Sequence, residues 1–124
     1  MEQLDAVLIV DDNPDLLEVH AEVLMTLGHL SIHRASSALE ALHMYESVDP
    51  ALLILDEGLA DMRGSELLRK LRQVNAHARK PALFVTGARS SVDCLPGDVV
   101  LEKPVDMQRL LAVVEALVAE PKLH

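Results

Sequence analysis

Short apolar runs alternate along the chain with segments whose apolar residues recur every three or four positions. The runs are rich in valine, isoleucine and leucine, a composition typical of strands that are buried on both faces of a parallel sheet. One weaker run alternates in polarity and suits an edge strand. The pattern predicts five strands, at residues 5–10, 30–33, 51–55, 82–85 and 99–101.

The segments between these runs have helical periodicity and recognisable start signals. The expected helices follow Asn13-Pro14, the capping-box sequence of Ser37 and Glu40, Gly64, and Asp106. In the second of these helices we expect Leu39, Leu42 and Tyr45 to face inward, and in the third Leu67, Leu68, Leu71 and Val74.

Strands and helices alternate, except in the connection between the fourth and fifth strands. This alternation predicts an α/β fold in which helices cover both faces of a parallel sheet. The connection, residues 87–97, has no amphipathic stripe and is close to the minimum of about a dozen residues that a parallel crossover needs. A fourth helix is therefore expected to be short or absent. With 124 residues, the chain is expected to form one domain over residues 1–124.

Composition narrows the range of partners. The formal net charge is −9, from 20 acidic and 11 basic residues, whereas nucleic-acid binding needs clustered positive charge. Cys94 is the only cysteine, which suits a reducing compartment. No apolar run approaches the roughly 20 residues of a membrane span. We therefore expect a cytoplasmic protein that binds neither nucleic acid nor a membrane.

Polar residues stand where the predicted strands end. Asp11 and Asp12 follow the first strand, Asp56 follows the third, Thr86 follows the fourth and Lys103 follows the fifth. The carboxyl ends of parallel strands meet at one crevice of an open α/β sheet. These side chains are therefore expected to lie together, in a combination that suits a phosphoryl group.

The chemistry of this set depends on its charges. Asp11, Asp12 and Asp56 would repel one another unless a divalent cation lies among them, and Mg²⁺ is the expected cation because it prefers a few carboxylates, waters and a phosphate oxygen. A carboxylate can attack a phosphoryl donor to give an acyl phosphate. Each residue alone also has an ordinary explanation, Thr86 as a β-branched strand residue and Lys103 as an exposed lysine. It is the combination that favours a phosphoryl site.

Four sequence segments together resemble the receiver domain of two-component response regulators. They are VLIVDDNPD, LLILDEGLADMRG, PALFVTG and LEKP, in the order and spacing of that family. The resemblance covers essentially the whole chain, and it implies a flavodoxin-like, doubly wound sheet of five parallel strands in the order 2-1-3-4-5. The short 87–97 connection is similar to that of single-domain receivers of the alphaproteobacterial type and of receivers in hybrid histidine kinases.

The resemblance also implies roles for the acidic residues. Asp56 corresponds to the phosphoacceptor, and Asp12 to a direct Mg²⁺ ligand. Asp11 would be a second ligand, acting directly or through a water molecule. The backbone carbonyl of Gly58 would complete the protein ligands.

The remaining matches and mismatches concern the phosphoryl oxygens and the response to them. Lys103 would supply positive charge, Thr86 would turn its hydroxyl toward the phosphoryl group, and Pro104 matches a Lys-Pro step whose peptide bond is often cis in the family. Three positions depart from the pattern. Val100 stands where most receivers have a switching aromatic residue, Ala60 stands where they commonly have a proline, and the acidic Glu57 directly follows the phosphoacceptor.

The expected function is that of a phosphorelay receiver. A sensor histidine kinase or a histidine-phosphotransfer protein would phosphorylate Asp56, and the domain would signal by conformational change and by binding an unknown downstream protein. It is not expected to be an enzyme. One alternative is a pseudo-receiver that binds partners without being phosphorylated, which Val100 favours. Another is a haloacid-dehalogenase-type phosphatase, but that family needs two aspartates separated by one residue, and Asp11-Asp12-Asn13 lacks them.

Overall fold

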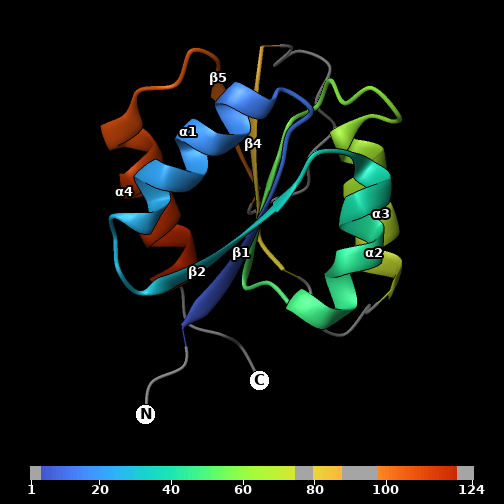
Figure 1. The fold of residues 1–124 in the computed structure, drawn as a ribbon, viewed down its shortest axis with the longest axis horizontal. Coiled ribbons are helices and arrows are strands. Elements are labelled where there is room, and N and C mark those ends of the chain that lie inside the picture. The colour runs from blue at the N-terminus through green and yellow to red at the C-terminus, as the bar shows by residue number, and fades with distance from the viewer. Residues whose placement is uncertain (1–3, 75–79, 88–97, 120–124) are drawn as a thin grey trace.

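Five strands and four helices make up the part of the chain that the computed structural model describes, residues 4–74, 80–87 and 98–119 (Figure 1). In chain order they are β1 (Asp5–Val10), α1 (Pro14–Met25), β2 (Leu30–Ala35), α2 (Ala38–Val48), β3 (Leu52–Leu55), α3 (Gly64–Val74), β4 (Ala82–Thr86), β5 (Val99–Glu102) and α4 (Met107–Ala119). The predicted strands and helices are all present.

The strands form one parallel sheet in the order β2-β1-β3-β4-β5, which confirms the predicted topology. The three inner strands carry the longest apolar runs: all of β3 and β4 is buried, as are the last four residues of β1. The edge strands β2 and β5 are only partly buried. Burial on both faces therefore explains why the inner strands lack alternating polarity.

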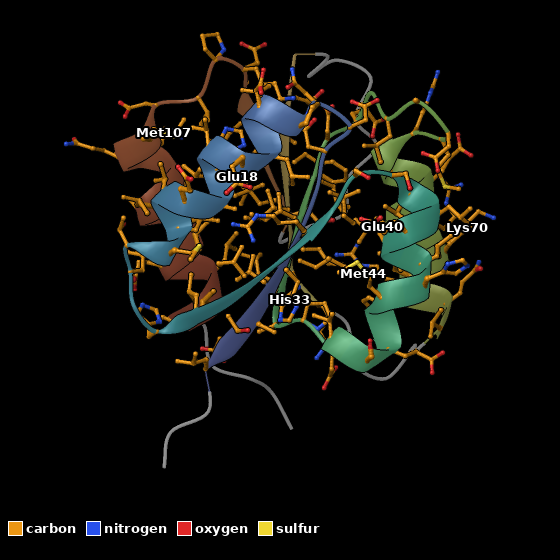
Figure 2. The ribbon with its side chains drawn as sticks, in the orientation of Figure 1. Glu18, His33, Glu40, Met44, Lys70 and Met107 are labelled. Carbon is orange, nitrogen blue, oxygen red and sulfur yellow. The ribbon has the colours of Figure 1, made fainter. Side chains whose placement is uncertain are left out.

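Helices cover the sheet on both sides. Helices α1 and α4 lie on one face, and α2 and α3 lie on the other (Figure 1). Each pair closes a separate apolar core over the sheet. Figure 2 shows Met44 of α2 directed toward the sheet and Lys70 of α3 directed away from it. The result is a three-layer sandwich whose strand ends remain accessible at the edge.

The predicted helix caps are present, with one difference. Asn13 accepts hydrogen bonds from the first turn of α1, and the Ser37 hydroxyl accepts one from the Glu40 backbone N–H at 3.1 Å. In a capping box the glutamate would accept the N–H of the capping residue itself. Here the Glu40 carboxylate instead accepts the N–H of Ser36, one residue earlier, at 3.0 Å.

A second acid caps α2 from a distant part of the chain. Asp61, in the loop between β3 and α3, accepts hydrogen bonds from the backbone N–H groups of Leu39 at 3.0 Å and Ala38 at 3.1 Å. The bonds from Leu39 and then Ala38 hold the pKa of the Asp61 carboxyl below its ordinary value. This contact ties the β3–α3 loop to the neighbouring helix.

Three details of the sequence prediction need correction. Strand β2 continues two residues beyond the predicted end because it pairs with the whole of β1. Leu39 and Val74, both predicted to face inward, are 58% and 49% exposed. In α2 the buried positions are taken by Ala38, Ala41 and Tyr45. The predicted reduction of a fourth helix falls mainly on residues 88–97, which lie outside the described part of the chain.

Among the described residues, no helix has both the length and the apolar character needed to cross a bilayer.

Candidate functional site

Three of the predicted site residues are held by hydrogen bonds that extend the sheet one residue past its strands. In each case a backbone N–H donates to a carbonyl of the adjacent strand. The bonds run from Asp11 to Ala35 at 3.2 Å, from Asp56 to Val10 at 3.0 Å and from Lys103 to Thr86 at 3.0 Å. The backbones of these residues are therefore as well fixed as the strands themselves.

The predicted acidic residues converge at this edge of the sheet. Asp11, Asp12 and Asp56 each offer a carboxylate oxygen, and these oxygens all lie within 4.8 Å of one another. Asp11 and Asp56 are buried, with 4% and 8% exposure, whereas Asp12 is exposed. The cluster therefore opens to solvent on the Asp12 side.

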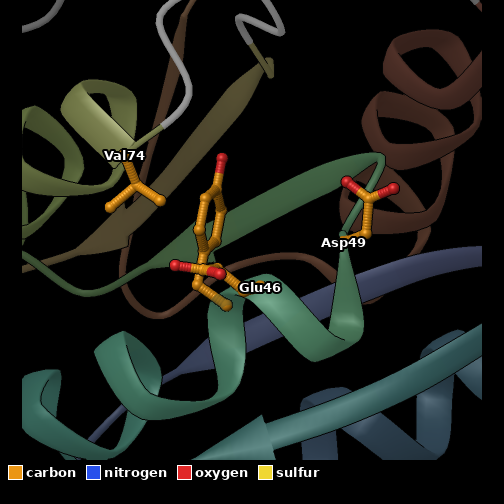
Figure 3. Close-up of a pocket in the computed structure, with 4 residues that line it drawn as sticks. Glu46, Asp49 and Val74 are labelled. Carbon is orange, nitrogen blue, oxygen red and sulfur yellow. The ribbon is translucent and has the colours of Figure 1, made fainter.

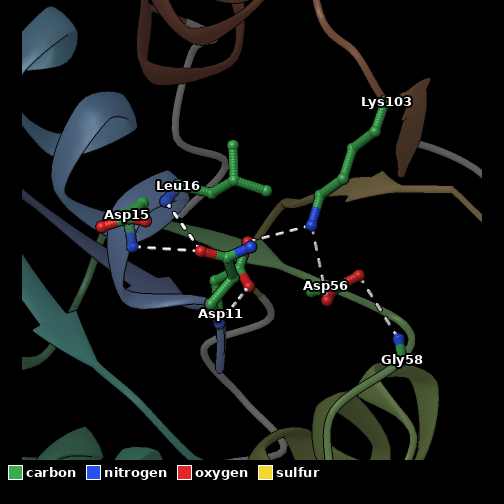
Figure 4. Close-up of polar contacts among 7 residues, drawn as sticks. Asp11, Asp15, Leu16, Asp56, Gly58 and Lys103 are labelled. Atoms are coloured by element: carbon green, nitrogen blue, oxygen red, sulfur yellow. Dashed lines mark hydrogen bonds and ion pairs between the residues drawn. The ribbon is translucent and has the colours of Figure 1, made fainter.

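Lys103 lies against two of these carboxylates. Its Nζ atom is 3.1 Å from Asp11 Oδ2 and 3.5 Å from Asp56 Oδ2 (Figure 4). The Lys103-Pro104 peptide bond is cis, as the resemblance implied. Three carboxylates and one ammonium leave the cluster with a formal charge of −2. A divalent cation would balance that charge.

Backbone N–H groups fix the other oxygens of the two buried aspartates. Asp11 Oδ1 accepts the N–H of Asn13 at 2.9 Å, and Asp56 Oδ1 accepts the N–H of Gly58 at 3.3 Å. Asn13 in turn caps α1 by accepting the N–H groups of Asp15 and Leu16 (Figure 4). The start of α1 and the orientation of Asp11 therefore depend on each other.

The donor set fits Mg²⁺. All the candidate ligands are oxygen atoms, and they come from a small number of carboxylates beside open solvent, as Mg²⁺ prefers. Among the described residues no thiolate or imidazole joins this acidic cluster, whose oxygen ligands differ from the thiolate and imidazole ligands typical of zinc and copper sites.

Two further predicted residues also lie at this edge. Thr86 ends β4, the strand between β3 and β5, and it is 1% exposed. Gly58 lies two residues after Asp56 in the β3–α3 loop, where it forms an isolated antiparallel bridge with Arg63. The role of the Gly58 carbonyl as a metal ligand remains a prediction.

Glu57 is more involved in this region than the sequence reasoning anticipated. It is 2% exposed, and both oxygens of its carboxylate accept hydrogen bonds from Ser65. The only signal in the sequence was the presence of an acid directly after Asp56.

His20 is a buried residue of α1 whose imidazole is affected by the charges of Asp11 and Lys103. It is 3% exposed. Burial lowers the pKa of its imidazole below the ordinary value, the Asp11 charge opposes this shift, and the Lys103 charge adds to it. His20 is therefore neutral at pH 7 and leaves the charge of the acidic cluster unchanged.

A surface pocket of about 380 Å³ lies at the other end of the molecule. Its lining residues are Tyr45, Glu46, Asp49 and Val74, at the carboxyl ends of α2 and α3 (Figure 3). Burial, and then the Asp49 charge, raise the pKa of the Tyr45 hydroxyl. The pocket includes none of the predicted site residues, so it is separate from the acidic cluster.

Comparison with known proteins identifies the family. Residues 7–115 match the family model described as the response regulator receiver domain. The chain belongs to this family. The predicted resemblance to receiver domains is thus confirmed, together with the strand order that it implied.

Individual relatives agree with this assignment. The transcriptional regulatory protein TrcR of Mycobacterium tuberculosis is 32% identical to this receiver domain over 116 residues, which are 90% of this chain and 44% of TrcR. A CheY-like receiver domain protein of Methanospirillum hungatei has 27% identity and a TM-score of 0.78, with 93% of this chain and 94% of that chain covered. The receiver domain of the hybrid histidine kinase CckA has 27% identity and a TM-score of 0.78, with 91% and 98% covered. The receiver domain described here spans about half the length of the first curated relatives that it matches.

Proposed function

We propose that this receiver domain accepts a phosphoryl group on Asp56 in the presence of Mg²⁺ and signals by changing conformation and binding another protein. The observation that carries the proposal is the convergence of Asp56 with Asp11, Asp12 and Lys103 at one edge of the sheet. Membership of the response regulator family supports it. Asp56 is assigned as the acceptor because it occupies the phosphoacceptor position in the family's sequence pattern.

The proposed transfer is a nucleophilic substitution at phosphorus. A carboxylate oxygen of Asp56 bonds to phosphorus as the bond between phosphorus and a donor histidine nitrogen breaks, and the electron pair of that bond returns to the imidazole. The product is an acyl phosphate. Bound Mg²⁺ supplies positive charge that offsets the charge on the transferring oxygens. Asp11, Asp12 and Asp56 would hold it, with the Gly58 carbonyl as the proposed additional ligand.

Two other residues are assigned to the phosphoryl oxygens. Lys103 has its ammonium within 3.5 Å of Asp56 Oδ2, so a small movement of its flexible side chain would bring it to a phosphoryl oxygen. Thr86, at the end of the strand between those of Asp56 and Lys103, is the proposed hydroxyl partner. Phosphorylation adds about −1.5 to −2 charge and three acceptor oxygens. The contacts of these two residues are therefore expected to change most.

The proposed donors are a sensor histidine kinase or a histidine-phosphotransfer protein, and the proposed receptor of the signal is a further protein. The domain is proposed to be the modified protein itself and not an enzyme that turns over a separate substrate. The proposed setting is the cytoplasm, which agrees with the single cysteine of the chain.

Mass spectrometry after incubation with acetyl phosphate and Mg²⁺ tests the proposal. The wild-type protein should gain the mass of one phosphoryl group, and the gain should depend on Mg²⁺. The variant Asp56→Asn should gain none. Asp49→Asn is a matched control, because it makes the same chemical change at an exposed aspartate in the distant pocket.

The alternatives predict different results. A pseudo-receiver would remain unmodified although folded. A phosphatase would release inorganic phosphate in many turnovers without an acyl phosphate that persists on Asp56. Equal mass gain in wild type and Asp56→Asn would refute the assignment of the acceptor.

A further inference from the structure

We propose that Glu57 is a positioning residue for the phosphorylation site: its buried carboxylate anchors the β3–α3 loop to the start of α3 and so sets the positions of Asp56 and Gly58. The inference rests on the proposed function, because it concerns the same acceptor and the same metal. The contacts of Glu57 in this chain carry the inference.

The first observation is that Glu57 is both buried and fully engaged. Its exposure is 2%, and it is among the largest side chains that are completely enclosed. Carboxylate Oε1 accepts the backbone N–H of Ser65 at 2.7 Å, and Oε2 accepts the Ser65 hydroxyl at 2.8 Å. A buried carboxylate is costly unless its oxygens are hydrogen-bonded, and here both are.

The second observation is that Glu57 does the work of a helix cap. Helix α3 begins at Gly64, and the preceding residue, Arg63, has no acceptor atom in its side chain. An N-cap side chain normally accepts the N–H of the second or third helical residue. Ser65 is the second residue of α3, and Glu57 accepts its N–H from eight positions away. Its negative charge also suits the positive end of the helix dipole.

The third observation is that this anchor lies between two parts of the phosphorylation site. Glu57 lies between Asp56 and Gly58 in the sequence, and the Gly58 N–H donates to Asp56 Oδ1 at 3.3 Å. The backbone carbonyl of Glu57 also accepts the N–H of Gly64 at 3.0 Å. Glu57 is thus attached to the start of α3 by its main chain and by both carboxylate oxygens, and the flanking residues can move little without breaking these bonds.

The physical consequence concerns metal binding. Residues that orient metal ligands without touching the metal are often important: their removal typically lowers metal affinity or activity by about 10- to 100-fold. If Glu57 is such a group, its loss should weaken Mg²⁺ binding more than its loss of folding stability would explain. Its charge is of less importance here than its two hydrogen bonds.

Three variants separate the effect of the two hydrogen bonds from that of the negative charge, and a fourth controls for lost folding stability. Glu57→Gln is nearly isosteric, and its amide can still accept from the Ser65 N–H and donate to the Ser65 hydroxyl. Glu57→Leu removes both bonds. Ser65→Ala removes one bond and leaves Glu57 in place, so it serves if Glu57→Leu does not fold. Val114→Ala is the control for lost stability, because Val114 is fully buried in the core on the opposite face of the sheet.

Mg²⁺ affinity is measured by following amide chemical shifts in ¹⁵N-labelled protein, and unfolding is measured without metal. Glu57→Leu should weaken Mg²⁺ binding by about tenfold or more, and Ser65→Ala should weaken it less. Glu57→Gln should remain within about twofold of wild type, since it keeps the hydrogen bonds. Val114→Ala should lose stability but keep wild-type affinity. Wild-type Mg²⁺ affinity in both Glu57→Leu and Ser65→Ala, or equal losses in Glu57→Gln and Glu57→Leu, would overturn the inference.

A metal-free measurement separates this inference from the proposed function. The amide resonance of Gly58 reports its hydrogen bond to Asp56, and it should shift in Ser65→Ala, which leaves the residues next to Gly58 unchanged, but not in Val114→Ala. An unchanged Gly58 resonance in Ser65→Ala would refute the positioning role. Wild-type protein that binds no Mg²⁺ would refute the proposed function, and the Gly58 comparison would still decide whether Glu57 positions the loop.

Discussion

Replacing Gly64 by alanine tests how closely α3 packs against Asp56, the proposed phosphoacceptor. A Cβ atom at residue 64 would lie well inside 3.0 Å of the Asp56 carbonyl oxygen, at 3.0 Å from the carbonyl carbon and at 3.2 Å from the Cα of Glu57. All three atoms belong to the backbone, so no side-chain rotation can make room. Relieving the overlap requires a movement on the order of 1 Å, of α3 or of the Asp56 backbone.

The expected magnitude follows from two opposing effects. Alanine favours a helix over glycine by up to about 1 kcal/mol, whereas overpacking of a well-packed contact costs about 1 to 3 kcal/mol. With the full helix-propensity gain subtracted, we expect Gly64→Ala to lose up to about 2 kcal/mol of unfolding free energy. A displacement of about 1 Å at the acceptor should also slow phosphorylation by about 100-fold.

Urea denaturation and the rate of phosphorylation by acetyl phosphate measure the two effects. Gly87→Ala is the matched control, because a Cβ there would meet no atom of the described residues within 4 Å. It should leave stability within about 0.5 kcal/mol of wild type, as expected for substitutions away from packed contacts. If Gly64→Ala is as stable as wild type and is phosphorylated at the wild-type rate, the packing argument is wrong.

Three further predictions concern charged contacts. Arg72 binds Asp98 through two hydrogen bonds of 2.7 and 3.1 Å, and the two side chains are only 15% and 1% exposed. Arg72→Met should therefore lower the unfolding free energy by about 3 kcal/mol in a denaturation experiment, the lower end of the range for a broken buried pair. A loss below about 1 kcal/mol would show that the pair contributes no more than an exposed one. The hydrogen bond to Glu115 raises the pKa of His29 above 6.5. The stabilisation that this contact gives the folded protein is therefore complete below pH 6.5 and is lost as the pH rises through the raised pKa. An NMR titration should show the raised pKa of His29 in wild type and a lower one in Glu115→Gln, and identical titrations would contradict this prediction. The backbone N–H groups at the start of α2 lower the pKa of Asp61, so the stabilisation that its carboxylate gives the folded protein is present above pH 3.8 and is lost as the pH falls through the lowered pKa. Asp61→Asn should therefore lower the thermal midpoint at pH 7 and lower it less at pH 3. An equal decrease at both pH values would show that the charge of Asp61 is not the source of this stabilisation.

The strand ends were the most predictable part of this chain. Apolar runs without alternation identify buried parallel strands, and a parallel sheet brings the residues after those runs to one edge. For this reason the sequence alone places Asp11, Asp56 and Lys103 at one edge of the sheet, where the structure has the Lys103 ammonium 3.1 Å from Asp11 and 3.5 Å from Asp56. This prediction needs only the positions of the strands and none of the details of side-chain packing.

Side-chain packing on the helices was less predictable. Leu39 has the periodicity of an inward-facing residue, yet alanines fill the corresponding space in α2 because that helix packs closely on β1 and β2. Helical spacing defines a stripe but does not say where its edges lie. The contacts of Glu57 could not be predicted for a different reason. Its partner, Ser65, is eight residues further along the chain and reaches Glu57 only because the β3–α3 loop folds back, which no local sequence pattern indicates.

The short strand β5 is held by ion pairs at both ends. Asp98, just before the strand, is bound by Arg72 of α3, and Lys103, just after it, contacts Asp11 and Asp56. Between these anchors β5 pairs with β4 along its whole length, and the Lys103 backbone N–H donates to the Thr86 carbonyl at 3.0 Å. The strand backbone is therefore held at both ends and along one side. A rearrangement at Lys103 is expected to fall on its long side chain and to leave the strand where it is.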